Sequence, residues 1–205
     1  MKQLLVATHN PAKKLELKGG FIPLVQSGVE LLFLDDLHIT NDPEETGKTF
    51  KENALLKAKY FANLSHLPTV ADDGGIEIDK LNGEPGIHAK RWLGRDATDQ
   101  ELVNNTLQRL DGIPFEKRTA HFQIALCYYN PLTKKTIYST ASLDGVIAEK
   151  MGPNALKGFP YRSLFIVDKY QKYYDEMTDK EHVDINHRLR AVKNLLPLIK
   201  EDLLQ

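Results

Sequence analysis

Short apolar runs alternate with amphipathic stretches along the first part of the chain. Residues 3–7 are an apolar run that suits a buried strand, and Asn10 and Pro11 then provide an N-cap and a first helical residue. Residues 30–34 predict a second strand, and residues 42–47 form an acidic loop. A strand therefore leads directly into a helix at the start of the chain.

The capping-box spacing occurs in residues 49–52 and again in residues 98–101, each time ahead of apolar positions at helical spacing. It predicts helices that run to about residues 64 and 110. Between them, a strand begins at Thr69, ends at the pair Asp72–Asp73 and resumes at residue 76. Because neighbouring residues of a strand point to opposite faces, we expect the two carboxylates to have different roles.

The second half of the chain is richer in strands. The stretches 118–129 and 136–148 predict a long hairpin, and a further strand is expected over residues 164–167. The last helix begins near Asn186, and Pro197 is expected to kink it or to end it early. This order of strands and helices favours an α/β fold with a mixed sheet.

Composition excludes several classes of protein. A length of 205 residues with 41% apolar content suits one domain over residues 1–205, and two lobes of that domain are compatible with the order of elements. The 27 basic and 28 acidic residues nearly cancel, which argues against nucleic acid or an anionic membrane as a partner. Cys127 is the only cysteine, so an internal disulfide is excluded. We find no signal peptide or membrane span and expect a cytoplasmic protein.

Two segments could hold phosphate groups. A helix that begins after Thr8 and Asn10 offers backbone N–H groups and the positive end of its dipole, and Lys13 adds a charge one turn later. An ordinary capped helix with a solvated lysine would show the same pattern. Lys57 lies four residues after Asn53 on the second predicted helix, so the two share a face and Lys57 is a candidate phosphate ligand.

Two acidic segments could meet around a metal ion. Magnesium prefers carboxylate oxygens and usually shares its coordination shell with substrate phosphates. Glu44 and Glu45 in the acidic loop, together with Asp72 and Asp73, supply such oxygens. The alternative is that the glutamates are solvated loop charges and that the aspartates begin a turn. Glu52 is better explained as the acid of the capping box.

Aromatic and basic residues near the C-terminus could bind a base. Phe159 and Tyr161 offer aromatic faces for stacking, and Arg188, next to His187, can donate to a carbonyl edge. The histidine spacings match no zinc helix motif, and no serine or cysteine nucleophile stands in a recognisable frame. A zinc hydrolase and a catalytic triad are therefore not expected.

The ordered set of these segments resembles the inosine triphosphate pyrophosphatase family, which acts on noncanonical purine nucleoside triphosphates. The segments are residues 7–13, 49–58, 71–75, 85–86, 157–161 and 186–188. The resemblance implies an elongated α/β protein with two lobes around a central cleft, related in fold to the Maf proteins and commonly a homodimer. It also implies magnesium-dependent hydrolysis of ITP, dITP or XTP to the monophosphate and pyrophosphate, a house-cleaning activity on the nucleotide pool.

The resemblance also assigns roles to residues. It implies that Lys13 and Lys57, with Thr8 and Asn10, hold the triphosphate. Glu45 and Asp73 would bind magnesium, and Asp73 would also accept the proton of the attacking water. The other positions that it places at the substrate are His9, Gly74, Lys90, Phe159, Tyr161, Arg162, His182, His187 and Arg188.

Three positions depart from the pattern of that family. Gly74 stands where a serine is usual, Arg162 replaces the acid of a Gly-Phe-Gly-Tyr-Asp-Pro loop, and His182 replaces a lysine. The phosphate and metal groups are thus kept, while the groups that would contact the base are altered. The alternatives are a Maf-like pyrophosphatase that acts on another base and a nucleotide sensor that has lost turnover. We expect ATP to be a poor substrate and XTP to be preferred over ITP.

Overall fold

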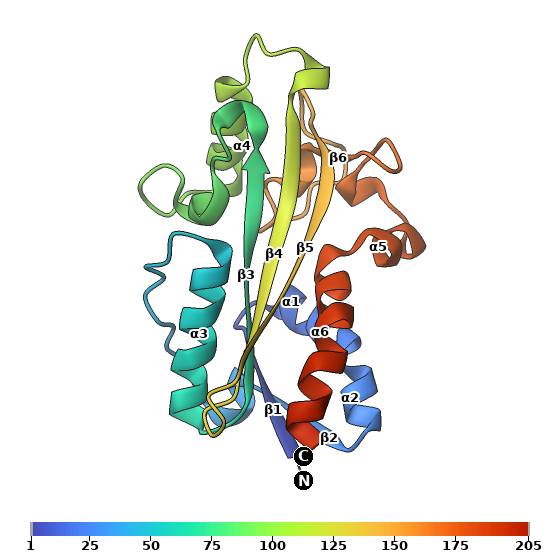
Figure 1. Ribbon diagram of the computed structural model, residues 1–205. Helices are drawn as coiled ribbons and strands as arrows, with labels where there is room; N and C mark the ends of the chain where they lie inside the picture. Colours follow the sequence, from blue (N-terminus) through green and yellow to red (C-terminus); the bar gives the residue numbers. More distant parts are fainter. Residues whose placement is uncertain (1, 205) are drawn as a thin grey trace. The chain divides into compact units, whose positions relative to one another are not determined.

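The computed structural model describes residues 2–204 as a mixed seven-stranded sheet with flanking helices (Figure 1). The strands are β1 (Lys2–Ala7), β2 (Val29–Phe33), β3 (Thr69–Ile78), β4 (Thr119–Tyr129), β5 (Thr136–Ile147), β6 (Phe165–Val167) and β7 (Lys172–Tyr173). Their order is β2-β1-β3-β4-β5-β6-β7. β1 runs parallel to β2 and β3, whereas β6 is antiparallel to β5 and β7. The mixed α/β sheet predicted from the sequence is confirmed.

Six α-helices accompany the strands in residues 2–204. They are α1 (Pro11–Gly20), α2 (Ile22–Gln26), α3 (Phe50–Ser65), α4 (Asp99–Arg109), α5 (Asp179–Ile185) and α6 (His187–Leu204). Within this range, no helix has both the length and the apolar character that crossing a bilayer requires. The short helices α2 and α5 were not expected, although Thr178 and Glu181 form a capping box at the start of α5.

The described residues cluster into two compact units. Unit 1 contains the residues up to Asp73, residues 124–141 and the residues from His187 onward, and unit 2 contains residues 74–123 and 142–186. β3, β4 and β5 contribute residues to both units. Each unit has its own apolar core, so each is described by itself.

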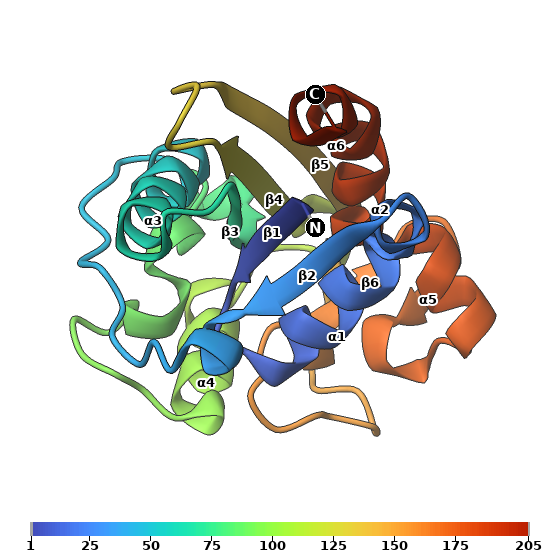
Figure 2. The ribbon, with the colours of Figure 1, turned by 90° about the horizontal axis from the view of Figure 1, so that it is seen from below.

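The core of unit 1 follows from the alternation of side chains along β1. Leu4 and Val6 pack with apolar residues of α1, α2 and α6, whereas Leu5 and Ala7 pack with residues of α3. Figures 1 and 2 show α3 on one side of these strands and α1, α2 and α6 on the other. β3 pairs with β1 in the same sheet. Because successive residues of a strand point to opposite faces, adjacent residues of β3 also point toward the two different helix layers.

The structure lacks the predicted interruption of β3, and it lacks the early end of α6 that was one of two effects expected of Pro197. β3 does not end at Asp72–Asp73 but continues to Ile78, because Gly74 and Gly75 take strand conformations here and neither has a positive φ. Pro197 does not end α6, which continues to Leu204. Pro197 has no N–H to donate to the carbonyl of Lys193 in the preceding turn. Both residues are exposed, so water can hydrogen-bond to that carbonyl instead.

His121 ties three neighbouring segments of unit 2 together. Its Nδ1 lies 2.9 Å from Oδ1 of Asp144 on β5, and its Nε2 lies 3.4 Å from Oδ2 of Asp79, which follows β3. The hydrogen bond with Asp144 is the main cause that raises the pKa of His121; burial opposes it, and the charge of Asp79 adds to the rise. The protonated imidazole therefore binds both carboxylates in the folded state.

This arrangement predicts a stability that depends on pH. Because folding raises the pKa of His121, its contribution is fully present below the ordinary imidazole pKa and is lost as the pH rises through the raised value. We expect His121→Gln to lower the urea midpoint at about pH 6 and to leave it unchanged at about pH 9. The effect should stay below about 1 kcal/mol because the site is partly solvated. An equal loss at both pH values would contradict the prediction.

Candidate active site

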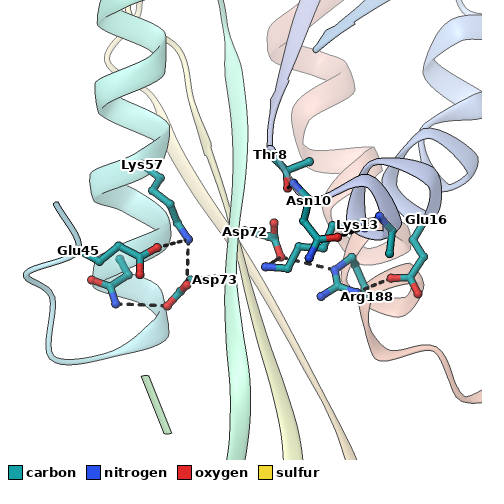
Figure 3. Close-up of polar contacts among 11 residues, drawn as sticks. Thr8, Asn10, Lys13, Glu16, Glu45, Lys57, Asp72, Asp73 and Arg188 are labelled. Atoms are coloured by element: carbon teal, nitrogen blue, oxygen red, sulfur yellow. Dashed lines mark hydrogen bonds and ion pairs between the residues drawn. The ribbon is translucent and has the colours of Figure 1, made fainter. Parts of the chain in front are cut away.

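Asp72 and Asp73 lie side by side on β3 and point to opposite faces of the strand (Figure 3). Each carboxylate has its own set of charged partners in unit 1. The two aspartates thus have different contacts, and their different roles stay a prediction.

Asp73 belongs to a cluster with Lys57, Glu45 and Asn53, called here the Asp73 cluster. Nζ of Lys57 lies 2.9 Å from Oδ1 of Asp73 and 2.8 Å from Oε1 of Glu45. Nδ2 of Asn53 donates to Oδ2 of Asp73 at 3.3 Å. Lys57 and Asn53 are one turn apart on α3, so a single helix face holds both carboxylate oxygens of Asp73. Between Glu44 and Glu45, the geometry favours Glu45 as the residue of this cluster.

The acidic loop is fastened to the start of α3, which places Glu45. The backbone N–H of Gly47 donates to Oδ1 of Asn53 at 2.8 Å, and a Cβ at Gly47 would lie only 2.5 Å from that oxygen. Thr49 caps α3 by accepting from the N–H of Glu52. The carboxylate of Glu52 accepts from the N–H of Lys48 at 2.6 Å, so it closes the loop outside the expected capping box.

The charges of the Asp73 cluster suit a bound cation. Two carboxylates face one ammonium, which leaves one negative charge in excess. Burial raises the pKa of Asp73, and the Lys57 charge only partly opposes this rise. Burial opposes the charge of Lys57, but the charges of Asp73 and Asp72 together with the hydrogen bonds to Asp73 and Glu45 raise its pKa. The cluster therefore favours a positively charged occupant.

Asp72 belongs to a second cluster, the Asp72 cluster, with Lys13, Arg188 and Glu16. Oδ2 of Asp72 lies 2.9 Å from Nζ of Lys13 and 3.5 Å from Nε of Arg188, and Glu16 also pairs with Arg188. Asp72 is only 3% exposed. Burial would raise the pKa of Asp72, but the charges of Lys13 and Arg188 outweigh it and hold that pKa well below the usual range. Asp72 is thus a permanently ionised anchor for two cations.

The start of α1 carries the predicted phosphate residues. Oδ1 of Asn10 accepts from the N–H groups of Ala12 and Lys13 at 2.9 and 3.3 Å, and Oγ1 of Thr8 accepts from the N–H of Asn10. These N–H groups are therefore used by the cap in this structure. His9 lies beside Asp42, with Nε2 to Oδ1 at 3.7 Å. The charge that this segment offers to an anion is the ammonium of Lys13.

The other predicted substrate residues divide between the two units. His187 and Arg188 begin α6 in unit 1, whereas Gly74, Lys90, Phe159, Tyr161, Arg162 and His182 belong to unit 2. Tyr161 is buried and its hydroxyl donates to the carbonyl of Ala89 at 2.7 Å. Phe159 is half-buried, and Lys90 is exposed.

Two residues of these clusters, Asn53 and Glu16, are not among the site residues predicted from the sequence. Asp72 was a candidate metal-binding carboxylate, but its partners Lys13 and Arg188 were not predicted. Glu16 lies three residues after Lys13, so the helical spacing of α1 could have placed the two on one face. Its pairing with Arg188, which is 172 residues away, has no local signal.

Comparisons with known proteins identify the family of this chain. The model of the Ham1 family matches residues 4–198. The dITP/XTP pyrophosphatase of Bacillus subtilis is 38% identical over 200 residues, which cover 98% of this chain and 98% of that protein. The dITP/XTP pyrophosphatase of Yersinia pseudotuberculosis is 36% identical over 202 residues, which cover 98% of this chain and 100% of that protein.

Solved structures give the same result. A HAM1 protein from Coxiella burnetii matches with a TM-score of 0.85 at 28% identity, covering 98% of this chain and 100% of that chain. A nucleoside-triphosphatase, or dITP/XTP pyrophosphatase, from Mycobacterium abscessus matches with a TM-score of 0.78 at 34% identity, covering 96% and 99%. The resemblance drawn from the ordered segments is confirmed, and the chain belongs to the Ham1 family.

Proposed function

We propose that this protein hydrolyses noncanonical purine nucleoside triphosphates, namely ITP, dITP and XTP, to the monophosphate and pyrophosphate. The observation that carries the proposal is the pair of charge clusters on the two faces of β3 at Asp72–Asp73. The names of the relatives from Bacillus subtilis and Yersinia pseudotuberculosis support the choice of substrate. This activity would remove damaged purine nucleotides from the nucleotide pool.

Glu45 and Asp73 are the residues that would hold magnesium. The donor set fits, because both are carboxylates and both already converge on one positive charge, the ammonium of Lys57. Among residues 2–204, no group of three or more His, Cys, Asp or Glu side chains could hold a metal ion. Two carboxylates suffice for magnesium, which usually keeps water and substrate phosphates as its other ligands. When bound, the ion supplies charge neutralisation to the phosphate oxygens.

The chain's own residues would divide the remaining work. Lys13 and Lys57, with Thr8 and Asn10, would balance and orient the triphosphate. Asp73 would accept the proton of the water that attacks the α-phosphorus. Burial raises the pKa of Asp73, which makes it a stronger proton acceptor than an exposed aspartate. Asn53 and Lys57 fix the direction of its two oxygens.

The two faces of β3 are coupled electrostatically. Lys57 contributes to lowering the pKa of Asp72 on the opposite face, and Lys13 likewise acts on Asp73. A polyanion held by both lysines would therefore alter the balance of both clusters at once. Such prearranged charge is the main source of catalysis in phosphate chemistry.

Product analysis tests the proposed cleavage. The protein is incubated with ITP, dITP, XTP and ATP in the presence of magnesium, and pyrophosphate and orthophosphate are measured separately. We expect the monophosphate and pyrophosphate from the oxo-purine substrates and little turnover of ATP. Release of diphosphate and orthophosphate would overturn the assignment of the cleaved bond.

The metal assignment predicts a selective effect of Glu45→Gln. The substitution removes one of the two carboxylates that face Lys57, so we expect the magnesium concentration for half-maximal activity to rise about tenfold or more. The matched control is Glu44→Gln in the same loop, which should leave the magnesium titration unchanged. If Glu44→Gln shifts the titration and Glu45→Gln does not, the ligand is Glu44.

A further inference from the structure

Asn53 is a buried asparagine within a helix of unit 1. It is the fourth residue of α3 and is only 2% exposed. Asparagine is a poor helix former, and a buried amide lowers stability unless its polar atoms find partners. Both ends of this amide have a partner, one in the acidic loop and one on β3. The residue at this position therefore serves contacts with other segments and not the formation of the helix.

The backbone of Gly47 fixes the orientation of this amide. Its N–H lies 2.8 Å from the side chain of Asn53, and because a backbone N–H can only donate, the atom that it meets must be Oδ1. The amide nitrogen is thereby turned toward Asp73, and Nδ2 lies 3.3 Å from Oδ2 of that carboxylate. While the acidic loop is fastened to α3, Asn53 thus presents a donor to Asp73.

The direction of the Asp73 carboxylate depends on hydrogen bonds, because the χ2 torsion of aspartate is broad. Nζ of Lys57 holds Oδ1 at 2.9 Å (Figure 3), and Asn53 holds Oδ2. Lys57 is also a proposed ligand of the triphosphate, and a lysine ammonium on its flexible stem can turn from one anion to another. The short side chain of Asn53 is held at both ends. When Lys57 turns to the phosphates, the bond from Asn53 remains.

We propose that Asn53 is a positioning residue that keeps the carboxylate of Asp73 in its working direction during turnover and couples that direction to the fastened acidic loop. The inference rests on the proposed function and deepens it. The bond on Oδ2 leaves Oδ1 directed at the ammonium of Lys57, on which Glu45 also converges. Oδ1 is released when Lys57 moves. It then takes the proton of the water as the water oxygen bonds to the α-phosphorus and pyrophosphate leaves.

Asn53→Asp separates the two hydrogen bonds of this side chain. The carboxylate can still accept from the N–H of Gly47, but it has no donor for Asp73. We expect kcat at saturating magnesium to fall about 10- to 100-fold, the usual scale for losing a group that orients a ligand in an active site. KM for the nucleotide should change less than about 3-fold, because Lys13 is unchanged. The matched control is Asn194→Asp, at an exposed asparagine of α6, which should leave both constants unchanged.

A double-mutant cycle with Asp73→Asn separates positioning from a structural role. If Asn53 acts through Asp73, then Asn53→Asp should change kcat less than about twofold in the Asp73→Asn background. The combination also exchanges the donor and the acceptor, so the urea midpoint that Asn53→Asp lowers by placing two buried carboxylates face to face should recover. A fall of kcat of the same size in both backgrounds would overturn the proposal.

Asn53→Ala is a second variant, which adds no charge and suits the helix. It can form neither hydrogen bond, so kcat should fall here too, even if Asn53→Asp does not fold. Wild-type protein that releases pyrophosphate from none of ITP, dITP and XTP would overturn the proposed function and this inference together. Wild-type kcat with normal products in Asn53→Ala or in Asn53→Asp overturns the inference only.

Discussion

Asp73→Asn is expected to lower turnover about 10²- to 10⁴-fold, the usual scale for the loss of a general base. Asn has the shape of Asp but cannot accept the proton of the attacking water. The measurement is kcat at saturating nucleotide and saturating magnesium, so that weaker metal binding does not contribute to the loss. Nucleotide binding should remain, because Lys13 and Lys57 are unchanged.

Stability should not fall with turnover in this variant. Burial disfavours the charged form of Asp73, so removal of the charge relieves a cost of folding. The matched control is Glu52→Gln, which alters a nearby carboxylate that accepts from the N–H of Lys48. It should change kcat only a few-fold. Activity of Asp73→Asn within a few-fold of wild type would remove Asp73 from the role of proton acceptor.

The parts of the fold that the sequence predicted are those with local signals. Asn10 and Pro11 start α1, and Thr98 with Glu101 starts α4, because caps and first-turn residues depend on a few neighbouring positions. The strands β1, β4 and β5 were predicted from their apolar content. The glycines after Asp73 misled the prediction, since their freedom permits an extended strand as readily as a turn.

The site was predictable only in part, because some of its contacts have no local signal in the sequence. Helical spacing related Asn53 to Lys57, and strand alternation separated Asp72 from Asp73. The pairing of Glu16 with Arg188 joins residues 172 positions apart, and the contact of Arg162 with Tyr174 joins two separate elements. Such contacts are set by tertiary packing, which no short pattern encodes. The motifs therefore indicated which residues depart from the family pattern, but not the side chains that they contact.

The roles of the two aspartates predict opposite outcomes for the same substitution on adjacent residues. Asp72→Asn is expected to lower the free energy of unfolding by about 2–4 kcal/mol, slightly below the usual cost of removing one partner from a buried ion pair. The reason is that Lys13 and Arg188 lose a shared carboxylate that is only 3% exposed. The loss should stay below the full cost because Arg188 keeps Glu16 and because the Lys13 side chain is 25% exposed.

Urea unfolding followed by far-ultraviolet circular dichroism measures this effect, with the midpoint falling and the slope unchanged. The matched control is Asp35→Asn, which removes the carboxylate partner of Lys14 on the adjoining surface, where the Asp35 side chain is 71% exposed. That control should leave the midpoint unchanged, because exposed ion pairs contribute little. A wild-type midpoint for Asp72→Asn would show that Asp72 is not an anchor. A loss of stability in Asp72→Asn with none in Asp73→Asn would place the structural carboxylate on one face of β3 and the chemical one on the other.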